Sequence, residues 1–394
     1  MNNVRLAKPK NRAELEKMIR LAGPCEAGAV HMLPKAELLL VFADGLSAPA
    51  AGILKQELLS RGGEAVNHRE VLVNKIERST VLLMGTRAQL AAACKNLKKQ
   101  QFGLPELARQ LEQVLEVGSR ESFCVPHSKG VLEMGKDTVV MGILNITPDS
   151  FSDGGCFNEH KRAIERGISL FEQGAAIIDI GGESTRPGFV PVSAEEEKKR
   201  ILPVISGLAA VLDIPVSVDT SKAEVAQEAL AAGAGIINDI GGLQQDPQMA
   251  EVAALAQAPV IIMHNPQEMT PEDGDIMADV CRFFYRSLAI GKNAGMSDDM
   301  FILDPGLGFK KTAAQNMQII RRLDELSGFG LPVLVGPSRK SFIGAALSVP
   351  VEERLPGTVA AAVLSAVRGA NVLRVHDVAE ILEVLKMSAA ILNS

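Results

Sequence analysis

The chain has 394 residues, of which 47% are hydrophobic and 22% are charged, so it is long enough for two domains or for one large barrel with an appendage. This composition excludes a single small module and an intrinsically disordered chain. The net charge of −6, the absence of Trp and the single Tyr argue against nucleic-acid binding, because they provide neither a basic surface nor base-stacking rings.

Neither the first residues nor the cysteines indicate export. Residues 1–13 contain basic side chains but no apolar core of signal-peptide length, and no later apolar run is long enough to span a membrane. The five cysteines are scattered and form no CxxC or CxxH pair, which argues against a disulfide framework and a zinc site. We therefore expect a cytoplasmic protein with no membrane partner.

Residues 1–120 are expected to form a small α/β domain. Two apolar runs have β-strand character, Glu37 to Ala43 and Ser79 to Met84. Four helical stretches accompany them: Asn11 to Ala22, Ala48 to Ser60, Arg87 to Lys98 and Leu104 to Glu116. The expected turn at Ala43 to Gly45 has no GxGxxG pattern, so the sequence assigns no function to this domain.

Residues 121–394 have a different, repeating pattern. An expected hairpin, Phe123 to Val125 with Val131 to Met134, precedes short apolar runs that alternate with helical stretches. The runs are Thr138 to Leu144, Ala176 to Ile180, Pro215 to Val218, Gly235 to Ile237, Pro259 to Met263, Met300 to Leu303, Pro332 to Val335 and Asn371 to Val375. Eight βα units in about 260 residues predict a (β/α)8 TIM barrel, because open doubly wound sheets usually have fewer strands. The hairpin is expected at the barrel bottom, and the charge run Glu195 to Arg200 is expected to be a solvated helix face.

Polar side chains end or follow each apolar run, at the end of the barrel where TIM-barrel active sites lie. They are Asn145, Asp179, Asp219, Asn238, Asp239, His264, Asp304, Ser338, Arg339, Lys340, Arg374 and His376. Capping of a turn or a helix explains each of them singly. Their occurrence at the same end of all eight strands indicates a functional site.

These residues offer two kinds of binding chemistry. Closing the barrel places the eighth strand beside the first, so Arg374 and His376 are expected near Asn145, where they could bind phosphate together with a divalent cation. Residues on the other strands could pair each edge of a flat heterocycle: Asp219, Asn238, Asp304 and Lys340. The polar loops Thr147 to Gly155 and Ser184 to Gly188 are predicted to act as lids.

Seven stretches of the barrel resemble the signature of the dihydropteroate synthase family, in the family's order. The two most specific are GILNITPDSFSDGG at 142–155 and SRKSFIG at 338–344. The others are DIGGESTRPG at 179–188, SVDT at 217–220, INDI at 237–240, DPGLGF at 304–309 and RVHDV at 374–378. The resemblance covers the barrel and leaves the N-terminal part without a role.

The resemblance implies an enzyme of folate synthesis, in a family known as a sulfonamide target. It would join 6-hydroxymethyl-7,8-dihydropterin pyrophosphate to p-aminobenzoate and release pyrophosphate, with Asn145 binding Mg²⁺ and with Lys340, Arg374 and His376 as further catalytic residues. Arg374 and His376 would hold the pyrophosphate. The implied pterin site consists of Thr185, Asp219, Asn238, Asp304 and Lys340. The other implied substrate-binding residues are Arg186 and the p-aminobenzoate pocket of Phe151, Pro187, Phe309 and Ser341. The resemblance also implies a homodimer.

Two positions depart from the family pattern. Residues 263–269 (MHNPQEM) differ from the usual stretch after the fifth strand, so His264 receives no catalytic role. Lys310 stands before Lys311, where the family usually has a small residue. This difference is expected to alter how the loop after the sixth strand packs.

Two other functions remain open at this stage. One is a pterin-binding methyltransferase acting on methyltetrahydrofolate and a corrinoid protein, and the other is a non-catalytic pterin-binding protein. A methyltransferase would reuse the pterin-binding carboxylates but has no use for a pyrophosphate clamp. Arg374 and His376 therefore favour the synthase.

Overall fold

The computed structural model describes residues 7, 9, 12–73, 75–118, 120, 122–135, 137–146, 156–183, 192–271 and 274–393. The chain divides into two compact units, one of Met1–Arg120 with Ser327–Gly330 and the other of Glu121–Leu326 with Leu331–Ser394. Within the described ranges, no helix combines the length and the apolar character needed to cross a membrane.

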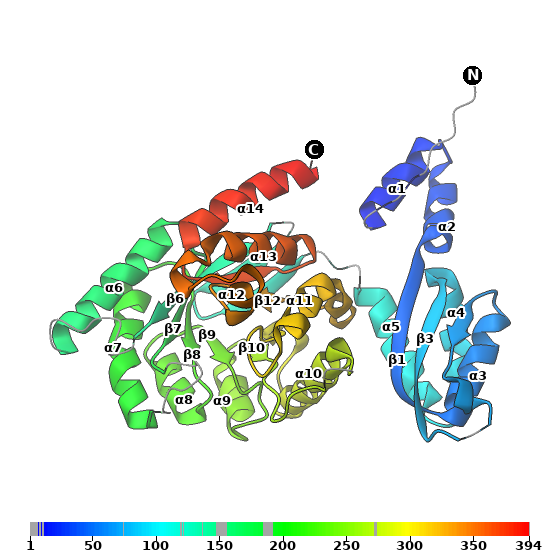
Figure 1. Ribbon diagram of the computed structural model, residues 1–394, viewed down its shortest axis with the longest axis horizontal. Helices are drawn as coiled ribbons and strands as arrows, with labels where there is room; N and C mark the ends of the chain where they lie inside the picture. The colour runs from blue at the N-terminus through cyan, green and yellow to red at the C-terminus, as the bar shows by residue number, and fades with distance from the viewer. Residues whose placement is uncertain are drawn as a thin grey trace. The chain divides into compact units, whose positions relative to one another are not determined.

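The first unit is a small α/β fold around an antiparallel sheet with strand order β1-β3-β2 (Figure 1). Its strands are β1 (Leu38–Ser47), β2 (Glu64–Val66) and β3 (Arg78–Thr86). Its helices are α1 (Arg12–Leu21), α2 (Glu26–Ala36), α3 (Ala48–Leu59), α4 (Arg87–Leu97) and α5 (Leu104–Val117), with a 3₁₀ turn at Arg69–Val71. The hydroxyls of Ser47 and Thr86 cap α3 and α4, so each strand leads directly into a helix.

Two features of this unit differ from the sequence-based expectation. The turn expected at Ala43 to Gly45 is a bulge, because β1 continues to Ser47 and its register with β3 shifts between Ala43 and Leu46. Gly45 has a φ of +70° at this bulge. The sequence analysis also missed β2, which is too short to show alternation, and α2, whose internal Pro34 is typical of a helix break.

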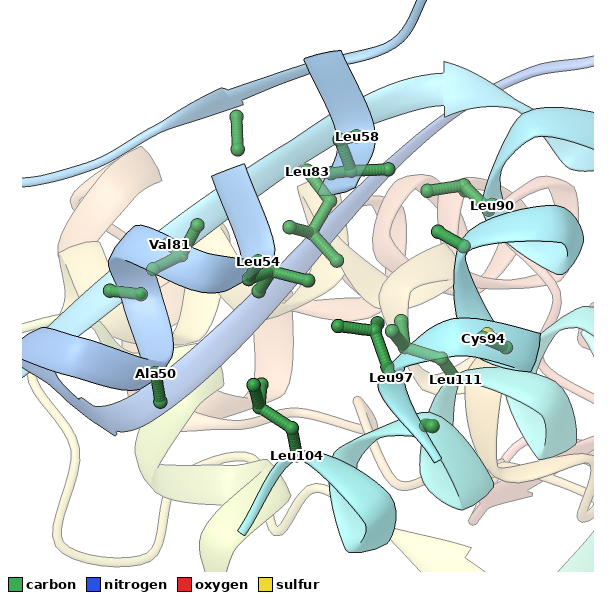
Figure 2. Packing of buried hydrophobic residues seen from close by; sticks show 14 of the residues in the cluster. Ala50, Leu54, Leu58, Val81, Leu83, Leu90, Cys94, Leu97, Leu104 and Leu111 are labelled. Carbon is green, nitrogen blue, oxygen red and sulfur yellow. The ribbon is translucent and has the colours of Figure 1, made fainter. Parts of the chain in front are cut away.

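The core of the first unit lies between its helices and one face of the sheet. Figure 2 shows Leu54 of α3, Leu83 of β3 and Leu97 of α4 converging, and all three are fully buried. On β1, Leu38 and Leu40 are 68% and 64% exposed. The hydrophobic effect therefore holds this unit together on the helical side of the sheet.

Truncation of Leu54 should destabilise the first unit. Leu54→Ala removes fully buried methyl groups and should lower its free energy of unfolding by about 2–5 kcal/mol, measured by denaturant-dependent hydrogen exchange of α3 and α4 peptides. The matched control is Leu72→Ala, because Leu72 is 91% exposed and should change the value by less than about 0.5 kcal/mol. Equal effects of the two substitutions would contradict this description of the core.

The second unit is an eight-stranded parallel barrel surrounded by helices (Figure 1), which confirms the predicted fold. The strands are β6 (Val139–Asn145), β7 (Ile177–Gly181), β8 (Val216–Asp219), β9 (Ile236–Asp239), β10 (Val260–Met263), β11 (Phe301–Asp304), β12 (Leu334–Val335) and β13 (Val372–Val375). The α-helices are α6 (Cys156–Glu172), α7 (Ala194–Val211), α8 (Ala223–Ala231), α9 (Met249–Ala256), α10 (Ile276–Asn293), α11 (Ala313–Arg321), α12 (Ser341–Leu347), α13 (Leu355–Val367) and α14 (Val378–Asn393). Short 3₁₀ helices lie at Asp298–Met300, Leu323–Phe329 and Val351–Glu353.

The barrel closes where its last strands meet its first and sixth strands. β13 pairs in parallel with β6 on one side and with β12 on the other. A bridge between Leu303 and Val333 joins β11 to the residue before β12. Each of the eight expected apolar runs coincides with a strand, with ends that differ by at most two residues.

An apolar layer fills the bottom of the barrel, and the hairpin of β4 (Phe123–His127) and β5 (Gly130–Met134) packs against it. The layer contains early residues of the strands: Met141, Ile177, Ile236, Ile261, Ile302, Leu334 and Val372. The hairpin contributes Phe123, Val125, Leu132 and Met134. This confirms the expected position of the hairpin and leaves the opposite end for polar side chains.

Candidate active site

The carboxyl ends of the first four barrel strands bring three of the predicted site residues into neighbouring positions. Asn145 pairs with Gly181, Gly181 with Asp219, and Asp219 with Asn238. A Cβ on Gly181 would lie 3.6 Å from Asn145 Oδ1 and 3.7 Å from Asp219 Oδ2. The side chains of Asn145 and Asp219 therefore border the same space above Gly181.

Arg374 on β13 forms the central interaction of this end of the barrel. Its Nε donates to Asp179 Oδ2 over 2.6 Å, and its Nη2 donates to Asp219 Oδ2 over 2.7 Å. Burial opposes the charge on the guanidinium, but the carboxylates of Asp179 and Asp219 raise the pKa of Arg374 above its usual value. Arg374 is therefore a permanent cation inside the barrel.

Asp179 was noted at a strand end in the sequence, but no role was assigned to it there. It is fully buried on β7, and its Oδ2 accepts a second hydrogen bond from Asn238 Nδ2 over 3.1 Å. Burial raises the pKa of Asp219, against the attraction of Arg374. Two carboxylates thus share one arginine, which lowers the cost of burying the three charges together.

Lys311, which the sequence analysis did not assign to the site, holds the loop after β11 in place. Asp304 Oδ1 accepts from Gly306 N over 2.7 Å, and burial raises the pKa of Asp304. Lys311 Nζ donates to three backbone carbonyls, those of His264, Gly306 and Phe309. Burial lowers the pKa of Lys311 to about 7. Gly306 has a φ of +65°, and a Cβ there would lie 2.2 Å from His264 O, so the loop requires glycine.

Lys340 and Phe309 lie together on the loops after β11 and β12. Lys340 Nζ is 4.5 Å from the centroid of the Phe309 ring, a cation–π contact. Burial and the charge of Arg374 lower the pKa of Lys340 to about 8. Ser341, the first residue of α12, is exposed. Phe309, Lys340 and Ser341 therefore border the outer part of the site.

His376 follows β13 and contacts the loop after β12. Its Nδ1 is 2.9 Å from Ser338 Oγ, and the same hydroxyl accepts from His376 N over 3.3 Å. Arg339 forms an ion pair with Asp377 over 2.6 Å. These contacts fix the end of the eighth strand beside the SRK motif, so His376 and Arg374 lie on the same strand end.

The charge run in α7 is only partly solvated, which corrects the sequence-based expectation. Glu197 is 1% exposed and Lys198 is 8% exposed. Lys222 Nζ donates to Glu197 Oε2 and to Glu183 Oε2, each over 2.6 Å. Glu197 is therefore buried because it takes part in an ion-pair network that anchors Glu183 after β7.

Four predicted substrate-binding residues, Phe151, Thr185, Arg186 and Pro187, lie outside the described residues, as do both expected lid loops. The other predicted site residues all occupy the carboxyl end of the barrel: Asn145, Asp219, Asn238, Asp304, Phe309, Lys340, Ser341, Arg374 and His376. Asp179 and Lys311 join them as residues whose roles required the structure.

His264 lies outside this polar cluster, although it follows β10. Its ring packs edge-to-face on Phe283 with 5.0 Å between centroids, and its Nε2 is 3.6 Å from Asp279 Oδ2. Both partners belong to α10. Burial lowers the pKa of His264 to about 4, although Asp279 acts in the opposite direction.

Buried His264 should make the barrel less stable in mild acid. Below pH 6.5, the ordinary pKa of histidine, His264 takes up a proton in the unfolded chain but stays neutral in the folded chain. Protonation therefore favours the unfolded state, and the free energy of unfolding decreases as the pH falls towards 4. The loss should reach about 1.4 kcal/mol per pH unit. His264→Gln should flatten the difference in unfolding free energy between pH 7 and pH 4.5, whereas the exposed control His31→Gln should not. An unchanged pH dependence in His264→Gln would refute this assignment.

Comparisons with known proteins identify the family. The model of the pterin-binding enzyme family matches residues 141–376. A dihydropteroate synthase of Bacillus subtilis is 47% identical over 270 residues, which cover 68% of this chain and 94% of the relative. A dihydropteroate synthase from Clostridium difficile, solved with pteroic acid, is 48% identical, with a TM-score of 0.64 over 66% of this chain and 99% of its own. The Xanthomonas albilineans enzyme in complex with 7,8-dihydropteroate is 42% identical, with a TM-score of 0.61 over 66% and 97%. The chain belongs to the dihydropteroate synthase family of pterin-binding enzymes.

Proposed function

We propose that this chain condenses 6-hydroxymethyl-7,8-dihydropterin pyrophosphate with p-aminobenzoate, giving 7,8-dihydropteroate and pyrophosphate in folate biosynthesis. The observation that carries the proposal is the presence, at one end of the barrel, of a partly buried arginine beside a set of acceptors that suits a pterin. Solved relatives that bind pteroic acid and 7,8-dihydropteroate support the same reaction.

The pterin is proposed to bind at Asp219, Asn238, Asp304 and Lys340, with Thr185 completing its site. A pterin presents adjacent N–H donors and a carbonyl along one edge. Asn238 and Asp304 are nearly fully buried, and Asn238 Oδ1 has no hydrogen-bond partner among the described residues. A buried acceptor without a donor is costly, so a ligand that supplies N–H groups is strongly preferred to one that does not.

The pyrophosphate is proposed to bind at Arg374 and His376. Arg374 is charged at any pH near neutrality, and its two ion pairs use Nε and Nη2. A cation in a buried site stabilises the negative charge that develops on a departing pyrophosphate more strongly than it would in water. His376 adds an imidazole on the same strand end, where Ser338 holds its Nδ1.

The oxygen ligands at the ends of β6 and β8 fit Mg²⁺. Among the described residues, no three His, Cys, Asp or Glu side chains gather as a metal site. Mg²⁺ bound to a nucleotide or pyrophosphate commonly takes only one or two protein oxygens and keeps several waters. Asn145 Oδ1, which borders the same space as Asp219, would hold the ion. Bound Mg²⁺ would neutralise part of the charge on the pyrophosphate.

The reaction requires positioning and electrostatic stabilisation but no protein nucleophile. The bond between the pterin methylene carbon and the pyrophosphate oxygen breaks, with its electron pair leaving on pyrophosphate. The p-aminobenzoate nitrogen then bonds to the methylene carbon and loses a proton. Phe309 and Ser341, together with Phe151, Arg186 and Pro187, are proposed to hold p-aminobenzoate and keep water from the reacting carbon. The family resemblance supports a cytoplasmic homodimer as the working form.

Product formation tests the proposal directly. The full chain, incubated with dihydropterin pyrophosphate, labelled p-aminobenzoate and Mg²⁺, should produce labelled dihydropteroate and one pyrophosphate per product. Removal of Mg²⁺ with a chelator should lower the rate at least about tenfold, because the leaving group then loses its counter-ion. Pterin binding without any product would overturn the proposal and favour a non-catalytic pterin-binding protein.

A further inference from the structure

Asp179 connects two residues that bind different parts of the pterin pyrophosphate substrate in the proposed reaction. Its Oδ2 accepts from Arg374 Nε over 2.6 Å and from Asn238 Nδ2 over 3.1 Å. We have assigned Arg374 to the pyrophosphate and Asn238 to the pterin. A single fully buried oxygen therefore fixes a leaving-group residue and a pterin residue relative to each other.

The strand order shows how a residue on β7 makes this connection. Arg374 lies on β13 and Asn238 on β9, and the barrel order between them is β13-β6-β7-β8-β9. Asp179 is on the middle strand of these five, so its carboxylate reaches two strands in each direction. Removing it leaves no other described carboxylate bonded to both side chains.

The carboxylate also determines how the Asn238 amide is oriented. An ionised carboxylate only accepts hydrogen bonds, so the Asn238 atom that faces Asp179 must be the Nδ2 donor. Asn238 Oδ1 is then directed elsewhere, and among the described residues it has no partner. This orientation leaves Oδ1 as an acceptor for an N–H group of the substrate.

We propose that Asp179 is a positioning residue that aligns the pyrophosphate cation Arg374 with the pterin acceptor Asn238. The inference rests on the proposed function. A bound substrate would touch both partners of Asp179, so the distance between them sets how the methylene–oxygen bond lies against the cation. A misplacement of about 1 Å in such a pair lowers the rate by about 100-fold.

Asp179→Asn is the informative substitution, because the shape of the side chain is kept while the charge is lost. Its amide oxygen can take the place of Oδ2 but carries no negative charge to hold the guanidinium of Arg374 and orders both donors less strongly, and its NH2 takes the place of Oδ1. The kcat should fall between about tenfold and 100-fold, and the dissociation constant of 6-hydroxymethyl-7,8-dihydropterin should rise. The KM for p-aminobenzoate should stay within about threefold, because Asp179 bonds to neither of its described partners, Phe309 and Ser341.

Two double-mutant cycles separate positioning from a general loss of structure. For kcat, Asp179→Asn combined with Arg374→Ala should be no slower than Arg374→Ala alone. For pterin affinity, Asp179→Asn combined with Asn238→Ala should bind no more weakly than Asn238→Ala alone. Multiplicative losses in either cycle would overturn the proposal, because Asp179 would then not act through that partner.

Asp239→Asn is the matched control. Asp239 is a buried carboxylate at the same barrel end, but it accepts from the backbone N–H groups of Gly241 and Leu243. Its substitution should lower the melting temperature and combine multiplicatively with Arg374→Ala. If Asp179→Asn does not fold, Asp179→Ser replaces it in both cycles, and failure of both variants to fold would overturn the proposal in favour of a purely structural role. Wild-type turnover reports on the proposed function separately, so the two failures can be distinguished.

Discussion

The carboxyl end of the barrel depends on one partly buried arginine that is held between two carboxylates. Arg374 lies within 2.7 Å of both Asp179 and Asp219, and a charge of either sign would be costly here without the other. The pairs hold side chains from β13, β7 and β8 at fixed positions before any substrate arrives. Such preorganised charge can act on a departing anion without further rearrangement.

The apolar core of the barrel and the charged group around Arg374 lie at opposite ends of the strands. Early strand residues such as Ile177 and Ile236 pack with the β4–β5 hairpin in the bottom layer. One pleat further along the same strands, Asp179 and Asn238 face the polar end. The loop after β11 is held in place because Lys311 donates to three of its neighbouring carbonyls and Gly306 fits against His264 O. The site is thus built on strand ends and a lysine-braced loop.

The sequence predicted the barrel and its polar end because both follow from local patterns. Apolar runs mark each strand, and Asn145, Asp219, Asn238 and Asp304 occur where those runs end. The same patterns say nothing about which polar groups bond to one another, so the pairing of Arg374 with two carboxylates required the structure. Single-residue exceptions also escaped the patterns, as Pro34 did inside α2 and Glu197 did in a charge run that is partly buried.

A crystal structure of the full chain with 6-hydroxymethyl-7,8-dihydropterin pyrophosphate and Mg²⁺ tests the central claim most directly. The account predicts the N–H edge of the pterin against Asp304 and Asn238, and the pyrophosphate against Arg374 and His376. It also predicts that the contact between Asp179 and Arg374 persists in the complex. A pterin bound away from these strand ends, or a pyrophosphate without contact to Arg374, would contradict it.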